Sequence, residues 1–396
     1  RRFAGFVVRR ARLTFVHPLF VHLLPGIRMT APLPLKQTPL FAEHLALSGK
    51  MIDFGGWSMP VSYGSQIDEH HAVRRGAGMF DVSHMLNVDV VGSEARPYLR
   101  HLLANDVDRL AEPGRALYSC MLNPQAGVVD DLIVYLLTPE HYRLVVNAAS
   151  ADKDLVWMAR VAQAGGYDVA IEPRRELAMI AVQGPQARDR LAQARPALGR
   201  LARGLAPFTA EGADGVLVAR TGYTGEDGVE VVLPGAEAPA LWRDLLAAGV
   251  APCGLGARDT LRVEAGLNLY GQDMDELTQP AEAGLAWTVS DHDPQRDFVG
   301  RAALAYGLKW QLLGLKLLDR GVMRAQMAVD TAEGAGMVTS GTMSPTLGTS
   351  IGFARLPDSV SPGDAAEVEI RGRRVPAVVC RLPFVRRGKV LDSGEP

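Results

Sequence analysis

The chain has 396 residues, of which 47% are hydrophobic, and its formal net charge is −2. This length is enough for two or three domains with large cores, and the near-neutral charge excludes an overall basic field for nucleic acid or acidic membranes. Three cysteines, Cys120, Cys253 and Cys380, lie far apart in the sequence, which argues against a zinc knuckle or a disulfide framework. This cysteine usage is typical of a reducing compartment.

The first residues differ in composition from the rest of the chain. Six arginines precede Met29, and the apolar run 13–27 is broken by two prolines, which makes it too short to span a membrane. A signal peptide or an arginine-rich transit peptide would explain the arginines, but no small-residue cleavage site is evident and the first serine is Ser48. We therefore predict that residues 1–35 are a non-structural extension and that Met29 is the native start.

The predicted elements follow in chain order from the spacing of apolar residues and from turn signals. They are helices over 38–50 and 66–77 (the second capped by Ser65), a strand over 86–91, a hairpin around 123–127, a strand over 141–147, a helix over 152–164, a strand over 179–184, a helix over 186–195, a strand over 229–233 and a helix that carries Arg258 and Arg262. Beyond residue 301, short β-type runs at 312–318, 351–356, 368–371 and 375–381 predict a separate all-β domain.

Two adjacent carboxylates stand between the predicted hairpin turn and an apolar strand. Because successive side chains of a strand point to opposite faces, Asp131 shares a face with Ile133 and Tyr135, and Asp130 lies on the other. One of the two therefore faces inward, where a carboxylate needs donors and is often functional. The alternative is that the aspartate only caps the turn.

Other polar residues have both a functional and a structural interpretation. Asn147 ends a predicted strand and either lines a pocket or caps the next helix. Glu226 lies in a loop with three glycines, where it is a candidate acceptor for an amino group or part of a simple turn. Arg258 and Arg262 can share one helix face, either to clamp a carboxylate or as an exposed ion-paired face.

Three histidines, His70, His71 and His84, raise the question of a metal site. Their spacing matches no metal-binding motif, so we predict solvated histidines on a helix face and no metal.

The stretch 254–259 is no dinucleotide fingerprint because Asp259 stands where glycine or alanine is required, so we predict no NAD or flavin.

Six short motifs together carry a resemblance. They are Ser-Gln-Ile-Asp-Glu-His-His-Ala-Val at 65–73, Met-Phe-Asp-Val-Ser-His-Met at 79–85, Asp-Asp-Leu-Ile-Val at 130–134, Thr-Gly-Tyr-Thr-Gly-Glu at 221–226, Gly-Ala-Arg-Asp-Thr-Leu-Arg-Val-Glu-Ala-Gly at 256–266, and Thr-Ser-Gly-Thr-Met-Ser-Pro-Thr-Leu-Gly at 339–348. In this order, from about Lys36 to the end, the chain resembles the T-protein family of the glycine cleavage system, which are folate-dependent aminomethyltransferases.

The resemblance implies a fold and a reaction. The fold is α+β, a three-domain disc-like aminomethyltransferase folate-binding fold with a C-terminal β-barrel. The domains are then 36–85 plus 173–260, 86–172 plus 261–306, and 307–396. The family takes an aminomethyl group from the lipoyl arm of its partner H protein, releases ammonia and passes the one-carbon unit to tetrahydrofolate. It gives 5,10-methylenetetrahydrofolate and dihydrolipoyl H protein.

The resemblance also implies site residues. The essential acid of the family falls on Asp131, with Asp130 as the alternative. Folate contacts fall on Met85, Tyr118, Asn147, Glu226, Arg258 and Arg386. We expect tetrahydrofolate as co-substrate, no nucleic-acid or membrane partner, and a cytoplasmic location in a bacterium, or the mitochondrial matrix if the extension is a transit peptide.

One departure from the family pattern lies before the acidic pair. Relatives usually carry two glycines there, whereas this chain has Ala126 followed by Gly127. We predict an ordinary negative φ for the alanine and a turn at the glycine.

Two rival families share features with the chain. The folate domain of a dimethylglycine or sarcosine oxidising enzyme carries a fused flavin domain, for which there is no fingerprint here. A non-enzymatic folate-binding protein of iron–sulfur maintenance carries a cysteine where Tyr223 stands.

Overall fold

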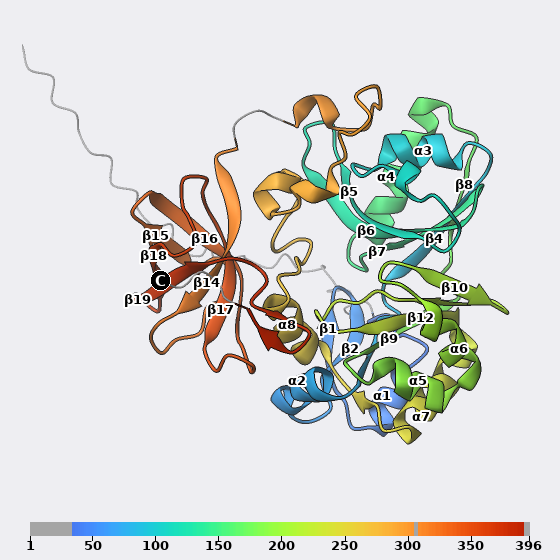
Figure 1. Ribbon diagram of the computed structural model, residues 1–396, viewed down its shortest axis with the longest axis horizontal. Helices are drawn as coiled ribbons and strands as arrows, with labels where there is room; N and C mark the ends of the chain where they lie inside the picture. Colours follow the sequence, from blue (N-terminus) through green and yellow to red (C-terminus); the bar gives the residue numbers. More distant parts are fainter. Residues whose placement is uncertain (1–33, 305–307, 392–396) are drawn as a thin grey trace, which may run out of the picture. The chain divides into compact units, whose positions relative to one another are not determined.

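The computed structural model describes residues 34–304 and 308–391, and the residues from Leu35 onward form one compact unit. Apart from its last two residues, the predicted extension 1–35 lies outside the described residues, as does Met29. The strands of the compact unit form a six-stranded sheet, a five-stranded sheet, a closed barrel and two two-stranded sheets (Figure 1). Mixed helices and sheets together with a terminal barrel agree with the predicted α+β class.

The six-stranded sheet has the strand order β10-β11-β12-β9-β3-β13 and one parallel pair, between β13 and β3. Its strands are β3 (Gly78–Asp81), β9 (Leu177–Gln183), β10 (Ala210–Ala213), β11 (Val216–Ala219), β12 (Gly228–Pro234) and β13 (Ala251–Pro252). Helices α5 (Ala187–Ala194), α6 (Pro196–Gly204) and α7 (Ala238–Ala247) pack on it, in green and yellow in Figure 1. Trp242 on α7 lies in their shared core.

The five-stranded sheet has the order β5-β6-β7-β4-β8 and is antiparallel throughout. Its strands are β4 (Leu86–Val91), β5 (Ala116–Leu122), β6 (Val128–Thr138), β7 (His141–Val146) and β8 (Ala170–Pro173). Helices α3 (Ala95–Leu102) and α4 (Ala151–Gly165) share its apolar core. The predicted hairpin is confirmed as β5 and β6, in which Cys120 pairs with Asp131.

The closed barrel has the order β14-β17-β16-β15-β18-β19 and contains all four β-type runs predicted beyond residue 301. Its strands are β14 (Trp310–Leu317), β15 (Ala328–Thr331), β16 (Gly334–Met343), β17 (Ser350–Pro357), β18 (Ala365–Ile370) and β19 (Arg373–Cys380). The sequence did not predict β15 and β16. Strand β16 contains three glycines, which are depleted in strands, so its membership in the sheet depends on pairing with β15 and β17 more than on local preference.

The remaining elements link these parts. They are α1 (Phe41–Ala46), β1 (Lys50–Phe54), β2 (Trp57–Ser62), α2 (Gln66–Arg75), α8 (Leu255–Glu264), β20 (Val385–Arg386), β21 (Lys389–Val390) and the short 3-10 helices η1 (Val107–Arg109), η2 (Gly235–Glu237), η3 (Pro280–Ala283), η4 (Ala286–Thr288) and η5 (Arg301–Ala303). Ser65 caps α2 as predicted, since its hydroxyl accepts from the Asp68 N–H at 3.2 Å. Helix α8 runs across the predicted domain boundary at residue 260, and the predicted division into domains stays a prediction.

The tip of the β5–β6 hairpin corrects the prediction for Ala126. This alanine has a φ of +65°, in the left-handed region that the sequence reserved for glycine. Gly127 is required for a different reason, because a Cβ there would lie 1.8 Å from the carbonyl oxygen of Glu276. The side chain of Asn123 accepts from the Gly127 N–H at 2.9 Å, and its amide donates to the same Glu276 carbonyl. These bonds fix the turn and hold Ala126 in a left-handed conformation that its own side chain disfavours.

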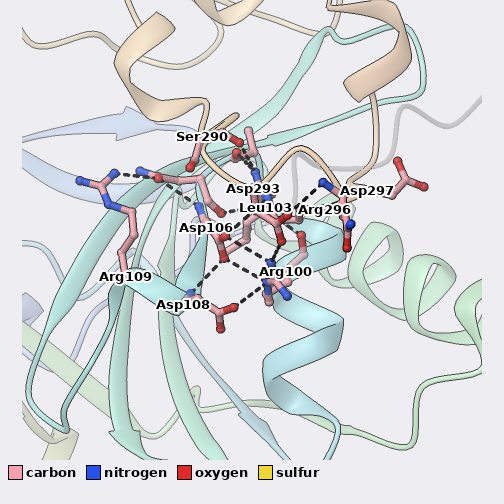
Figure 2. A network of polar contacts seen from close by, with 12 residues as sticks. Arg100, Leu103, Asp106, Asp108, Arg109, Ser290, Asp293, Arg296 and Asp297 are labelled. Carbon is pink, nitrogen blue, oxygen red and sulfur yellow. Dashed lines mark hydrogen bonds and ion pairs between the residues drawn. The ribbon is translucent and has the colours of Figure 1, made fainter.

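A buried arginine fastens the segment that follows η4 (Figure 2). The side chain of Arg296 is 2% exposed and its guanidinium donates to five main-chain carbonyls. The acceptors are Arg100 at 3.2 Å, Leu103 at 3.1 Å, Ala104 at 2.5 Å, Asn105 at 3.1 Å and Ser290 at 2.8 Å. Because three of the five acceptors lie between α3 and η1 and a fourth lies in the last turn of α3, this side chain helps to hold residues 290–296 against the five-stranded sheet.

A second buried network joins α2 and α8 to the barrel. The Glu264 carboxylate accepts from Arg74 at 2.8 Å, from the Ser344 hydroxyl at 2.5 Å and from the main chain of Thr346 at 3.0 Å. His70 lies 3.2 Å from the same carboxylate and is fully buried. The prediction of solvated histidines is therefore wrong for His70, because the barrel covers the face of α2 that the sequence left open.

We expect Glu264→Gln to remove an acid-sensitive part of the stability. Burial opposes ionisation of Glu264, but the hydrogen bond and charge of His70 and the charge of Arg74 lower its pKa to about 2. A lowered pKa stabilises the fold above about pH 4.5 and the benefit is lost as the pH falls toward 2. The wild-type advantage in the free energy of unfolding, at most about 3 kcal/mol, should therefore shrink over this range in urea titrations.

The matched control is Glu367→Gln on the exposed face of β18. This variant should follow the wild-type pH dependence throughout. A Glu264→Gln difference that stayed constant between pH 5 and pH 2 would contradict the role given to Glu264.

Candidate active site

The predicted acid Asp131 lies on β6 with its side chain turned toward aromatic residues. Its Oδ2 accepts from the Tyr118 hydroxyl on β5 at 2.7 Å. The ring of Tyr118 stacks on Trp287 of η4, with 5.4 Å between the ring centroids and 23° between the planes. Trp287 is 61% exposed, so this stack stands at the surface directly over the acid.

Asn147, which directly follows β7, binds both acids of the pair. Its side-chain amide donates to Asp130 Oδ1 at 2.9 Å and to Asp131 Oδ1 at 3.0 Å. Its main-chain N–H donates to Asp130 Oδ2 at 3.2 Å. Asp130 is fully buried on the opposite face of the strand. The predicted alternation of the two acids is confirmed, and Asn147 is the bridge between them.

The environment of Asp131 favours the protonated form. Burial and then the charge of Asp130 raise the pKa of Asp131, whereas the hydrogen bonds from Tyr118 and Asn147 lower it, and the result is a pKa of about 7. A carboxyl with this pKa can both accept and donate a proton at neutral pH. The turn-cap alternative does not describe Asp131, because its bonds reach side chains of β5 and of the residue after β7.

Arg258 on α8 extends the site. Its guanidinium lies over the ring of Tyr223, 4.4 Å from the centroid. Burial lowers the pKa of Arg258, while Tyr223 and Glu230 raise it and Arg262 lowers it further. Within residues 34–304 and 308–391, no side-chain ion pair or hydrogen bond of this guanidinium is found. Burial raises the pKa of the Tyr223 hydroxyl, the charges of Arg262 and Arg258 lower it, and the charge of Asp131 raises it.

Arg262 does not share the surroundings of Arg258. Its side chain is 2% exposed and pairs with Asp273 at 2.9 Å and with Asp259 at 2.9 Å. The predicted alternative of an exposed ion-paired face is therefore wrong for Arg262, which is paired but buried. Its donor to the Ser340 hydroxyl on β16, at 2.9 Å, ties α8 to the barrel.

Glu226 lies in the Gly-rich loop that also contains Tyr223, and Arg386 lies on β20. The side chain of Glu226 is 3% exposed, and its Oε1 accepts from Arg74 at 2.7 Å and from the Gly388 N–H at 2.7 Å. Gly388 belongs to the turn between β20 and β21, which carries Arg386 in an exposed position. The two predicted contacts are thus neighbours through this turn. No contact joins them to Asp131 among the described residues.

Met85 and His84 precede β4. Met85 is half-buried against the apolar cluster that contains Tyr135 and Val145. His84 is 5% exposed, so the prediction of a solvated histidine is wrong here as well. Burial lowers its pKa to about 4, with Asp81 raising it and Arg258 lowering it, so the ring is neutral at pH 7.

The structure therefore joins Asp131, Tyr118 and Asn147 by direct hydrogen bonds, whereas Arg258 contacts Tyr223. Tyr223 and Trp287 were not predicted as site residues. Tyr223 stands inside the Gly-rich loop that the sequence singled out, whereas Trp287 had no signal apart from its aromatic side chain. No group of histidine, cysteine, aspartate or glutamate that could hold a metal ion is found in the described part of the chain.

No helix among the described residues has the length and apolar character needed to cross a membrane.

Two family models match the chain, the GCVT N-terminal domain over residues 40–292 and the glycine cleavage T-protein C-terminal barrel domain over residues 311–386. The second match covers most of the β-barrel found here.

Curated relatives match almost the whole chain. An aminomethyltransferase of Bordetella parapertussis is 65% identical over 361 residues, which is 91% of this chain and 99% of the relative. An aminomethyltransferase of Bordetella petrii is 66% identical over 360 residues, covering 90% of this chain and 98% of the relative. An aminomethyltransferase of Ralstonia nicotianae is 55% identical over 374 residues, covering 91% and 100%.

A solved structure gives the same result. The glycine cleavage system aminomethyltransferase T from Bartonella henselae superposes with a TM-score of 0.84 at 35% identity, covering 89% of this chain and 99% of that chain. These findings confirm the predicted family, fold class and aminomethyltransferase function, and they do not favour the iron–sulfur maintenance alternative. The chain belongs to the glycine cleavage T-protein family.

Proposed function

We propose that the chain moves the one-carbon unit of an aminomethyl group from the lipoyl arm of an H protein to tetrahydrofolate. The products are ammonia, 5,10-methylenetetrahydrofolate and dihydrolipoyl H protein. The observation that carries this proposal is the half-buried Asp131 carboxyl, which has a pKa of about 7 and accepts a hydrogen bond from Tyr118 of the Tyr118–Trp287 stack. Family membership supports both the folate and the H-protein partner.

The proposed folate site uses the groups described above. A flat pterin ring suits the aromatic surfaces of Tyr118 and Trp287. Glu226 is the proposed acceptor for the amino-pyrimidinone edge through Oε2, because its two described bonds occupy Oε1. Arg258 and Arg386 are the proposed partners for the carboxylates of the glutamate tail, since one has no ion-pair partner among the described residues and the other is exposed. Met85 and Asn147 are proposed to complete the wall of the site.

The proton balance assigns a task to Asp131. Tetrahydrofolate loses the hydrogens of N5 and N10 when the methylene bridge forms. The departing amino group takes up one hydrogen to leave as ammonia, and the lipoyl sulfur takes up the other. We propose that ionised Asp131 holds the folate nitrogens in register, stabilises positive charge on nitrogen and passes a proton between these atoms.

We also propose a cytoplasmic location. The matched relatives come from bacteria, and nothing in the comparisons supports the mitochondrial alternative.

A reconstituted assay tests the proposal. The purified chain is incubated with aminomethyl-loaded lipoyl H protein and tetrahydrofolate, and methylenetetrahydrofolate, ammonia and free thiol are each quantified. We expect the three products in equal amounts and none when either substrate is omitted. Folate binding without any of the three products would instead favour a non-enzymatic folate-binding protein.

Tyr118→Phe is expected to shift the pH profile of turnover. The hydroxyl of Tyr118 lowers the pKa of Asp131, so its removal should raise that pKa above about 7. If the ionised acid is the working form, the rising limb of kcat moves to higher pH. The measurement is kcat between pH 5.5 and 9 for both proteins.

Tyr167→Phe is the control, because the Tyr167 ring contacts Tyr98 and His101 and not the acidic pair. Its profile should coincide with that of the wild type. An unshifted midpoint in Tyr118→Phe would show that the limb does not report on Asp131.

A further inference from the structure

A third carboxyl lies behind the acidic pair. Asp154, in the first turn of α4, is fully buried, and neither of its side-chain oxygens has a hydrogen-bond donor in the described structure. An ionised carboxylate in such a place is strongly unfavourable because it has lost water. Burial, and then the charge and hydrogen bonding of Asp130, raise the pKa of Asp154 to about 10, although Ser150 and Lys153 lower it. At neutral pH the group therefore holds a proton.

Asp130 has the opposite environment. It accepts from the Ser150 hydroxyl at 2.8 Å, from the Asn147 side chain at 2.9 Å and from the Asn147 main chain at 3.2 Å. Three donors suit a negative charge. Ser150 also links the two acids, because its main-chain carbonyl accepts from the Asp154 N–H at 2.8 Å. Asp130 is thus surrounded by donors, whereas the side-chain oxygens of Asp154 have no donor in the described structure.

The other charged groups around α4 leave this pairing intact. Lys153 lowers the pKa of Asp154, but its ammonium group donates to the Val129 carbonyl at 2.6 Å, to the Tyr270 hydroxyl at 2.6 Å and to Glu276 at 3.0 Å. The charged side chains of the elements packed on α4 face elsewhere: Arg96 pairs with Asp108, Arg100 with Asp106 and Asp293, Arg175 with Asp152, and Glu172 is exposed.

We propose that Asp154 is a positioning residue whose O–H donates to the Asp130 carboxylate, so that the two acids share one proton. Asp130 is in turn bound by Asn147, which donates to Asp131. The shared proton thereby fixes the orientation of Asp131 and leaves a single negative charge behind it. The role in turnover rests on the function proposed above, whereas the shared proton itself does not.

The shared proton is not consumed during turnover, because the hydrogens of N5 and N10 supply those that ammonia and the lipoyl sulfur take up. It leaves only at high pH, when hydroxide removes it and two adjacent carboxylates remain. Their repulsion disturbs Asn147 and with it Asp131. The inference therefore predicts a loss of activity near pH 10, on the alkaline side of the profile.

The first test reads the proton directly. Infrared spectra at pH 8 should contain the carbonyl stretch of a protonated carboxyl in the wild type, and this component should be missing from Asp154→Asn. Asp152→Asn, an exposed acid on the same helix that pairs with Arg175, should keep it. An unchanged band in Asp154→Asn would overturn the shared proton, whether or not the chain has the proposed activity.

Thermal unfolding gives a second reading of the same proton. Because the folded-state pKa is raised from 3.8, the folded state keeps a proton that the unfolded state releases, and the contribution to stability falls as the pH rises toward 10. Asp154→Asn lacks this loss. Its Tm should gain on the wild type by about 1–2 °C for each pH unit between 6 and 9. A constant Tm difference over this range would contradict the inference.

The kinetic test separates positioning from packing. Asp154→Asn keeps a donor for Asp130 and cannot ionise, so it should turn over like the wild type at pH 7.5 and should lose the alkaline limb. Asp154→Leu has no donor and should lower kcat by about 10- to 100-fold with an almost unchanged KM for tetrahydrofolate.

Equal kcat values for the Asn and Leu variants, or an alkaline limb that persists in Asp154→Asn, would overturn the positioning role. Should the leucine variant fail to fold, the infrared and pH readings of Asp154→Asn still decide the question. A wild type that binds folate but makes no product would refute the proposed function and leave the infrared test valid.

Discussion

Asp131→Asn should fold, bind tetrahydrofolate and lose about 10²- to 10⁴-fold in kcat. The amide has nearly the shape of the carboxyl and can still accept from the Tyr118 hydroxyl, which bonds Asp131 at 2.7 Å. It cannot take up a proton or carry a negative charge opposite nitrogen as ammonia leaves. Equilibrium folate binding by fluorescence of Trp287, together with single-turnover kinetics, separates binding from the chemical step.

The control for this variant is Asp152→Asn, because Asp152 is exposed and pairs only with Arg175 among the described contacts. It should match the wild type in both measurements. Turnover by Asp131→Asn at the wild-type rate would remove Asp131 from the mechanism. A comparable loss in Asp130→Asn alone, with Asp131→Asn unaffected, would transfer the role to the alternative acid of the pair.

Arg296→Met should lower the free energy of unfolding by about 3–5 kcal/mol. The methionine fills most of the space but removes the guanidinium donor from five main-chain carbonyls, although the Ala104 carbonyl keeps the Ser290 N–H at 3.1 Å. The same change frees residues 290–296, which follow Trp287 on η4. We therefore also expect a higher KM for tetrahydrofolate. Urea unfolding and steady-state kinetics measure the two effects.

Arg109→Met is the matched control, because Arg109 belongs to the same group of side chains in Figure 2 but is exposed and donates only to the Asn105 side chain, at 3.1 Å. Its loss should cost less than about 1 kcal/mol. An Arg296→Met protein as stable as this control would mean that water replaces the guanidinium and that the segment is held by other contacts.

The alternation of side chains along β6 was predictable because a strand with one apolar face admits only one register. The alternation of the acids followed from that rule, whereas the hairpin and the four β-type runs beyond residue 301 followed from turn signals and composition. Strands β15 and β16 were not predicted, since the three glycines of β16 weaken its strand signal. They are held by pairing with each other, with β17 and with β18, and the local pattern of residue types does not contain this information.

The errors over His70 and His84 arise because a local pattern does not say what covers a side chain. His70 lies on α2 and is covered by Thr346 of the barrel and by the Glu264 carboxylate of α8. His84 lies in the turn before β4 and is also buried. Ala126 was mispredicted for a related reason, because contacts from Asn123 and Glu276 hold it in a conformation that its own side chain disfavours. In each case a tertiary contact outweighed the local preference.

Of the candidate site residues, the acids, Asn147 and Arg258 were singled out from the sequence pattern and Tyr118 from the family resemblance, and the structure joins Asp131, Tyr118 and Asn147 directly. Asp154 was within reach of sequence reasoning but was overlooked. It stands four residues before Met158 and eight before Ala162, which line the buried face of α4, so helical spacing already put a carboxyl among apolar side chains. Trp287 had no such pattern, because a stack between two rings depends on how η4 meets β5.

The hydrogen bonds of Val128, the first residue of β6, determine when this end of the strand can fold during translation. The N–H of Val128 donates to the carbonyls of both Asp275 and Thr278, and the neighbouring glycine leaves no space between the turn and Glu276. Roughly 150 residues must be synthesised after the hairpin before these acceptors emerge. A nascent chain halted before residue 275 would carry both acids next to a turn that lacks these hydrogen bonds. The end of β6 that carries Asp130 and Asp131 can therefore form all its contacts only when about two-thirds of the chain has been translated.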